Sequence, residues 1–182
     1  MHDHAKRLQA VRSLAAEQGL DAVLVTPGPD LRYLVGYDAV PLERLTCLVV
    51  RADGDPVLIA PALERLAAEA SPIGGMGLPI RTWGELDDPY ALVADVVGPA
   101  ATVALDNHMW AEKVLAVMAA LPDTRMTLAG NVISPQRMRK DAGEVAALMA
   151  AGAAIDAVHA QVPGMLRAGR TERQVGADIA DA

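Results

Sequence analysis

The residue types best suited to chemistry lie in the last quarter of the sequence, residues 134–182. Arg137, Arg139 and Lys140 form the one basic cluster of the chain, and cationic side chains of this kind bind anions and carboxylates. His159 and Glu172 follow them, an imidazole and a carboxylate, the groups that bind metal ions and transfer protons. An anion site and a metal or acid–base site are therefore the first hypotheses.

Local structure explains each of these groups without a catalytic role. His159 lies on the apolar stripe of a helix predicted for residues 142–162, without a carboxylate or second histidine at ligand spacing, and such a lone histidine is more often a core residue. Glu172 falls in the first turn of a second helix, where a carboxylate stabilises the helix dipole. The basic residues are interpreted as a turn that docks the first helix. No catalytic residue and no metal ligand is therefore assigned to this chain.

A second set of candidates lies in and just after the turn-rich segment 27–43. Its prolines and glycines prevent any long helix or strand, and loops that carry large side chains often carry function. Leu31, Tyr33 and Leu34 are explained as anchors that pin a short helix to a sheet. Packing explains three further residues less well, and they are our substrate-proximal or dimer-loop candidates: Tyr37, Asp38 and Arg44.

The elements that must position these residues alternate along the chain. Apolar residues at helical spacing and short β-branched runs bounded by glycine or proline distinguish predicted helices from predicted strands. We expect Trp110, Val114, Val117 and Leu121 to form the buried face of one helix, and an Asp53–Gly54 turn to join two antiparallel strands. This order predicts an α/β domain with a mixed β-sheet flanked by helices. The predicted helices span 3–18, 62–70, 87–97, 109–121, 142–162 and the residues from 171, and the strands span 22–26, 44–50, 56–60, 80–83, 102–106 and 125–130.

Composition narrows the class of protein. The 182 residues are 52% apolar, enough for a buried core, and contain no phenylalanine. A net charge of −7 argues against a nucleic-acid partner, because neutralising phosphates requires clustered Lys and Arg. The single cysteine, Cys47, lies in an apolar run and is interpreted as a buried small residue. We find no signal peptide and no run near the roughly 20 apolar residues of a membrane span, so we expect a cytoplasmic protein without a membrane partner.

Two motifs together resemble a known family. The first is Arg139–Lys140 followed by Glu144, a long helix, a glycine turn and Thr171–Glu172 opening the next helix, which resembles the start of the pita-bread metallopeptidase domain of prolidase, aminopeptidase P and creatinase. The second motif resembles the N-terminal domain of the same proteins, which usually carry Asn-x-x-Tyr-Leu-x-Gly. It occupies Asp30, Tyr33, Leu34 and Gly36, with Asp in place of Asn.

The resemblance implies a fold and an activity. Residues 1–132 would form a creatinase-type N-terminal domain, and residues 133–182 the first helices of an incomplete pita-bread (α+β) domain. It implies a dimeric Xaa-Pro dipeptidase or aminopeptidase that cleaves a peptide bond next to proline with two divalent ions, Mn, Co or Zn. In the family those ions are held by two Asp, one His and two Glu that would lie beyond Ala182. We therefore expect no metal bound to this chain, no activity from it alone, and a loop of Tyr37, Asp38 and Arg44 forming one wall of a neighbouring active site.

Other functions stay open. A non-catalytic creatinase-like module that binds peptides or a partner protein would share these features, and so would a creatinase-like amidinohydrolase. A nucleotide-binding domain is disfavoured because the GGMG stretch at 74–77 precedes a short strand, not a helix. Reading the coding frame past Ala182 would separate the metallopeptidase from the non-catalytic module, because metal ligands there would favour the peptidase. The apolar stripe of the 142–162 helix would normally pack on the absent sheet, so we expect the 182-residue chain to self-associate.

Overall fold

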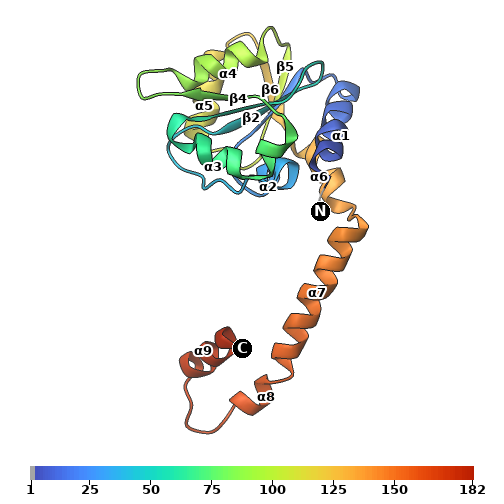
Figure 1. Ribbon diagram of the computed structural model, residues 1–182, viewed down its shortest axis with the longest axis vertical. Coiled ribbons are helices and arrows are strands. Elements are labelled where there is room, and N and C mark those ends of the chain that lie inside the picture. Colours follow the sequence, from blue (N-terminus) through green and yellow to red (C-terminus); the bar gives the residue numbers. More distant parts are fainter. Residues whose placement is uncertain (1–2) are drawn as a thin grey trace. The chain divides into compact units, whose positions relative to one another are not determined.

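The computed structural model describes residues 3–182, which form two compact units. The first extends to Arg139 and holds the β-sheet with its helices, and the second is Lys140–Ala182 and is entirely helical. The units are described separately below. Figure 1 shows the elements of both.

One mixed six-stranded sheet organises the first unit, in the order β4-β3-β2-β1-β5-β6 (Figure 1). β2 runs antiparallel to both of its neighbours, and the other pairs are parallel. Five strands therefore end at the same edge of the sheet, the edge where ligand sites of parallel sheets usually form. The bounds are β1 (Ala22–Val25), β2 (Cys47–Arg51), β3 (Val57–Pro61), β4 (Ile80–Trp83), β5 (Thr102–Leu105) and β6 (Arg125–Leu128).

Helices cover both faces of this sheet because its central strands are apolar on both sides. In β1, Val23 and Val25 join the core cluster shared with α1, α2, α3 and α6, whereas Ala22 and Leu24 join the cluster shared with α4 and α5. The period of two residues thus builds two cores from one strand. The helices are α1 (His4–Glu17), α2 (Pro29–Val35), α3 (Arg65–Ala70), α4 (Pro89–Val97), α5 (Ala111–Ala120) and α6 (Gly130–Met138).

The predicted fold class and most predicted elements are confirmed. Asp3 caps α1 by accepting a hydrogen bond from the Lys6 backbone N–H at 2.9 Å, and the predicted hairpin is the antiparallel pair of β2 and β3. Cys47 is fully buried in β2, and this burial raises the pKa of its thiol to about 12. The core interpretation of Cys47 is therefore correct.

The basic turn predicted from residue 134 onward is wrong for most of its length. Residues up to Met138 belong to α6, which contains Pro135, and only Arg139 and Lys140 follow the end of that helix. Val132 and Ile133 are buried in the core cluster that α6 shares with α1, and this packing outweighs the unfavourable effect of an internal proline on the helix. Arg137 consequently lies in the last turn of a helix in the first unit.

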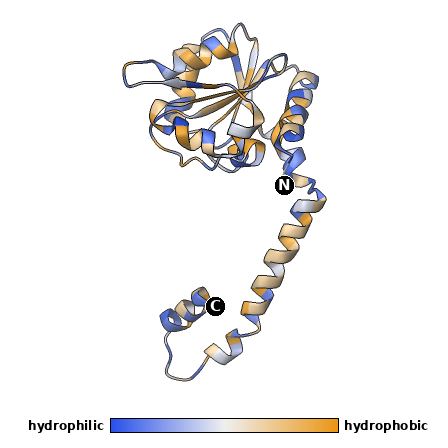
Figure 2. Ribbon diagram, viewed as in Figure 1, coloured by the Kyte–Doolittle hydropathy of each residue, from blue (hydrophilic) through white to orange (hydrophobic). Residues whose placement is uncertain are grey.

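The second unit contains α7 (Ala142–His159), α8 (Val162–Met165) and α9 (Glu172–Asp181). Both predicted capping boxes are present, Asp141 with Glu144 and Thr171 with Gln174, so the helix starts are confirmed. No residue of α7, every one of which is described, is buried, although Figure 2 shows largely apolar colours along it. His159 is accordingly exposed at its last turn and is not a core residue within this chain.

One segment meets a simple criterion for a membrane span. Residues Ala142–Met165 form a 24-residue helical stretch with mean hydropathy 1.5, and none of it is buried. A single segment of this kind is weak evidence, because core helices of soluble proteins satisfy the same criterion of length and composition. Two acidic residues, Glu144 and Asp156, also lie on this segment.

Candidate functional site

The candidate site lies where β1 and β5 end side by side. Thr26 directly follows β1, and Asp106 directly follows β5. One carboxylate oxygen of Asp106, Oδ2, accepts hydrogen bonds from the Thr26 backbone N–H at 3.2 Å and from its hydroxyl at 2.8 Å. The other oxygen, Oδ1, accepts the His108 backbone N–H at 2.8 Å. The buried Asp106 carboxylate therefore joins the ends of two strands.

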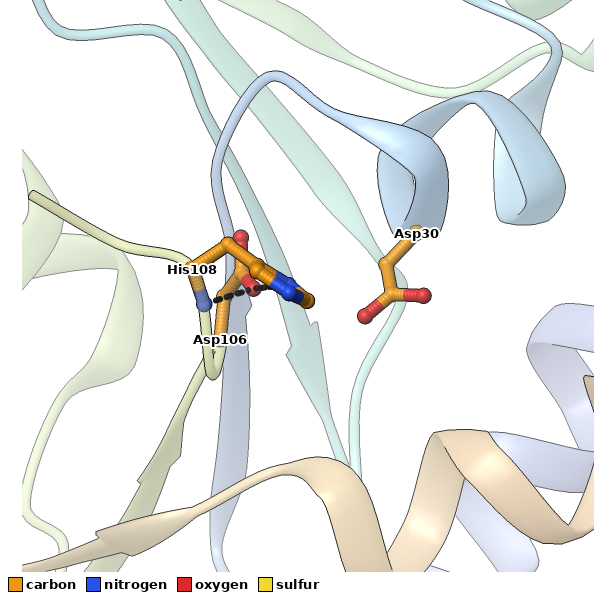
Figure 3. Close-up of side chains that lie close together, drawn as sticks. All are labelled: Asp30, Asp106 and His108. Atoms are coloured by element: carbon orange, nitrogen blue, oxygen red, sulfur yellow. Dashed lines mark hydrogen bonds and ion pairs between the residues drawn. The ribbon is translucent and has the colours of Figure 1, made fainter.

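Two further side chains with ligand atoms approach this carboxylate. Figure 3 shows His108 beside Asp106, and Asp30 opposite them, at the start of α2. One potential ligand atom of each residue lies within 4.8 Å of the other two. Asp30 is buried and His108 is exposed, so the cluster reaches the surface through the imidazole. Two carboxylates and an imidazole are a donor set that a divalent cation accepts.

The hydrogen bonds of the cluster argue against a metal ion. Arg137 Nη1 lies 2.5 Å from Asp30 Oδ1, so a permanent positive charge already neutralises one of the two carboxylates that a cation would need. The Asp106 carboxylate already accepts three hydrogen bonds, and His108 Nδ1 is 3.6 Å from its Oδ1. Three side chains arranged in this way do not fit a pair of ions. We assign the cluster a structural role, joining β1, α2, β5 and α6.

The sequence reasoning missed this cluster. Asp30 and Arg137 are 107 positions apart, and Thr26 and Asp106 are 80 apart. A usable signal was present, because Thr26 and Asp106 each end a predicted buried strand and the carboxyl ends of parallel strands share one edge. Arg137 belongs to the basic cluster that was predicted to dock the 142–162 helix, but it pairs with Asp30 of α2 and so joins α6 to α2 instead.

The predicted loop residues each have a separate environment. Tyr37 is buried in the core, and this burial, together with the Glu64 carboxylate, raises the pKa of its hydroxyl. Asp38 is exposed and forms an ion pair with Arg32 at 3.3 Å. Arg44 is half-buried and pairs with Glu85 at 2.7 Å. Asp38 and Arg44 therefore present charge at the surface, whereas Tyr37 anchors the loop from within.

Comparison with known proteins relates the whole chain to peptidases. A family model described as the creatinase/prolidase N-terminal domain matches residues 7–139. The probable dipeptidase PepE of Mycobacterium tuberculosis is 44% identical over 181 residues, covering 98% of this chain and 48% of that protein. The Xaa-Pro dipeptidase of Lactobacillus helveticus is 29% identical over 160 residues, covering 82% of this chain and 41% of that protein.

A solved structure gives the same relationship in three dimensions. The crystal structure of dipeptidase PepE from Mycobacterium ulcerans superimposes with a TM-score of 0.92 at 46% identity, covering 98% of this chain and 48% of that chain. The chain thus spans about half the length of the relatives it matches.

Proposed function

Because this chain belongs to the creatinase/prolidase N-terminal domain family, we propose that its protein is a dipeptidase of the Xaa-Pro type, which hydrolyses a peptide bond next to proline. The observation that carries the proposal is the likeness to dipeptidase PepE over 98% of the chain at a TM-score of 0.92. The similarity to a protein named Xaa-Pro dipeptidase supports the proposal that the enzyme selects peptides by their proline residue.

The proposed hydrolysis uses two divalent ions, Mn, Co or Zn, held by residues outside this chain. Paired ions of this kind supply a nucleophilic water and stabilise the negative charge that develops on the carbonyl oxygen. Asp30, Asp106 and His108 do not fit such a pair, since Arg137 and Thr26 already hold the two carboxylates. We assign no step of the hydrolysis to residues of this chain, and residues 1–182 alone should be inactive.

The proposed contribution of this chain is to position and enclose the peptide. The loop that carries Asp38 and Arg44 presents charged side chains beside an apolar tip, in which Val40 and Leu42 are exposed. In a homodimer this loop would form one wall of the neighbouring active site. The protein would act in the cytoplasm on proline-containing peptides, without nucleic acid or membrane, and the apolar surface of α7 would pack on protein.

The purified protein should hydrolyse Xaa-Pro dipeptides after incubation with Mn²⁺, Co²⁺ or Zn²⁺. We expect kcat/KM for Xaa-Pro to exceed that for the matched Xaa-Ala dipeptide by roughly tenfold or more, since specificity depends on a pocket that fits the proline ring. A chelator should abolish activity, and one of the three ions should restore it. Equal rates on both dipeptides, or full activity in chelator, would contradict the proposal.

One result would favour the non-catalytic alternative. A protein that binds proline peptides, but hydrolyses none of them with any of the three ions, would be a creatinase-like binding module. Isothermal titration with an Xaa-Pro dipeptide and with its Xaa-Ala counterpart provides the measurement. The exposed apolar tip of the loop at Val40 and Leu42 is the surface such a module would use.

The isolated residues 1–182 should self-associate through α7. The exposed fractions are 44% for Val145, 58% for Leu148, 71% for Met149 and 56% for Ile155, which leaves a row of apolar side chains without a covering layer in the described residues. Burying that row is favourable by about 25 cal/mol per Å². Light scattering should detect oligomers, and a variant with Leu148 and Met149 replaced by Gln should reduce them. A compact monomer that binds no dye for exposed apolar surface would refute this expectation.

A further inference from the structure

The segment between α2 and β2, residues 36–46, has no regular secondary structure, yet side chains from several elements form hydrogen bonds with it. The Trp83 indole N–H at the end of β4 donates to the Leu45 carbonyl at 2.9 Å, and the Thr46 hydroxyl donates to Glu64 at 3.0 Å. These contacts hold only the C-terminal end of the segment, next to β2. The middle of the segment, where Val40 and Leu42 are 68% and 46% exposed, needs a separate anchor.

Lys113 provides that anchor. Its Nζ, at the end of a side chain from α5, donates to the Leu42 carbonyl and lies 3.4 Å from the Arg44 carbonyl oxygen. The same Nζ is 4.7 Å from the centroid of the Trp110 ring. Two backbone carbonyls and an aromatic face thus surround one ammonium group, and all three are groups that attract a cation.

The burial of Lys113 makes this arrangement unusual. The residue is 2% exposed, although a lysine is almost never fully buried unless it is paired. Burial lowers the pKa of the ammonium group, while the nearby Glu112, Glu43 and Glu64 carboxylates act in the opposite direction. An apolar residue would pack on α5 without this desolvation cost. Packing of the core therefore does not explain why a lysine occupies this position.

We propose that Lys113 is a positioning residue that holds residues 37–46 in one conformation by binding the carbonyls of Leu42 and Arg44. The fixed backbone directs Val40 and Leu42 outward, together with the side chain of Asp38. A role for this geometry in peptide binding rests on the proposed function. The anchoring of the loop is independent of the proposed function, and it can be measured without any substrate.

Limited proteolysis tests the anchoring. Trypsin cleaves after Arg44, and to reach that bond the carbonyls of residues 42 and 44 must leave Lys113. In Lys113→Met, which keeps the length and removes the charge, cleavage should be at least roughly tenfold faster, since loss of a hydrogen bond to a charged group exceeds the about 1.4 kcal/mol that corresponds to tenfold. The new N-terminus at Leu45 is quantified by mass spectrometry. Lys113→Arg, which retains a charged donor, should restore slow cleavage at least in part.

Val117→Ala is the matched control. Val117 lies one turn further along α5, is 1% exposed and packs in the core beneath the helix, so its truncation destabilises α5 without removing the hydrogen bonds of Lys113. Cleavage after Arg44 that is no faster in Lys113→Met than in Val117→Ala would overturn the proposal. If Lys113→Met does not fold, the milder Lys113→Gln is compared with the same control.

Kinetics separate the two proposals. In a protein that hydrolyses Xaa-Pro dipeptides, Lys113→Met should raise KM more than it lowers kcat, because a loosened loop weakens peptide binding without altering the reacting groups. Val117→Ala should change neither constant. Absence of hydrolysis in the parent protein would refute the proposed function, and the proteolysis result would still decide the role of Lys113. If Lys113→Met lowered kcat and left KM unchanged, that result would contradict the positioning role.

Discussion

Asp106→Asn is expected to lower the free energy of unfolding of the first unit by about 3 kcal/mol. Both oxygens of the Asp106 carboxylate accept backbone N–H groups, one from Thr26 and one from His108. An asparagine amide has one oxygen, so either orientation places its NH₂ group against an N–H donor. The site is buried, which prevents water from replacing the lost acceptor.

Urea unfolding followed by tryptophan fluorescence measures this effect. Both tryptophans, Trp83 and Trp110, lie in the first unit, so their signal reports on that unit. Thr26→Val is the graded control, because it removes only the hydroxyl bond to Asp106 and should cost about 1 kcal/mol. If Asp106→Asn lowers the free energy of unfolding no more than Thr26→Val does, the carboxylate does not join the two strands as described.

Gly36→Ala should be the second strongly destabilising change, again at about 3 kcal/mol. Gly36 ends α2 with φ +71°, a conformation that an L-residue adopts at a cost. A Cβ atom at this position would lie 2.7 Å from Pro72 Cγ and 2.9 Å from His4 Nε2, closer than side chains approach. The chain would have to move just before Tyr37 and the loop of residues 37–46.

Gly19→Ala is the matched control for this substitution. Gly19 follows α1 with a similar φ of +66°, but a Cβ atom there would meet nothing within 4 Å. The difference in unfolding free energy between the two variants therefore isolates the close approach of Pro72 and His4 from the backbone strain. We expect about 1 kcal/mol for Gly19→Ala. Equal losses in both variants would show that the crowding around Gly36 is relieved by small shifts.

The features that the sequence predicted correctly depend on local rules. A short, continuous apolar run specifies β1, and its apolar residues on both faces imply helices on both sides. Capping boxes mark the starts of α7 and α9 because the bonded groups lie three residues apart. The α6 segment is the exception. Its basic residues suggested a turn, but the burial of Val132 and Ile133 determined its structure.

The sequence by itself determined the mixed α/β fold, the family and the loop as a place of interest, since each follows from residues close together in the chain. Only the tertiary structure decided which side chains meet. Thr26 pairs with Asp106, Asp30 with Arg137 and Lys113 with the Leu42 carbonyl, across 80, 107 and 71 positions respectively. Strand order brings these partners together, and a polar side chain carries no local signal of its distant partner. For that reason Lys113, within an apolar helix face, was predicted neither as buried nor as an anchor of the loop.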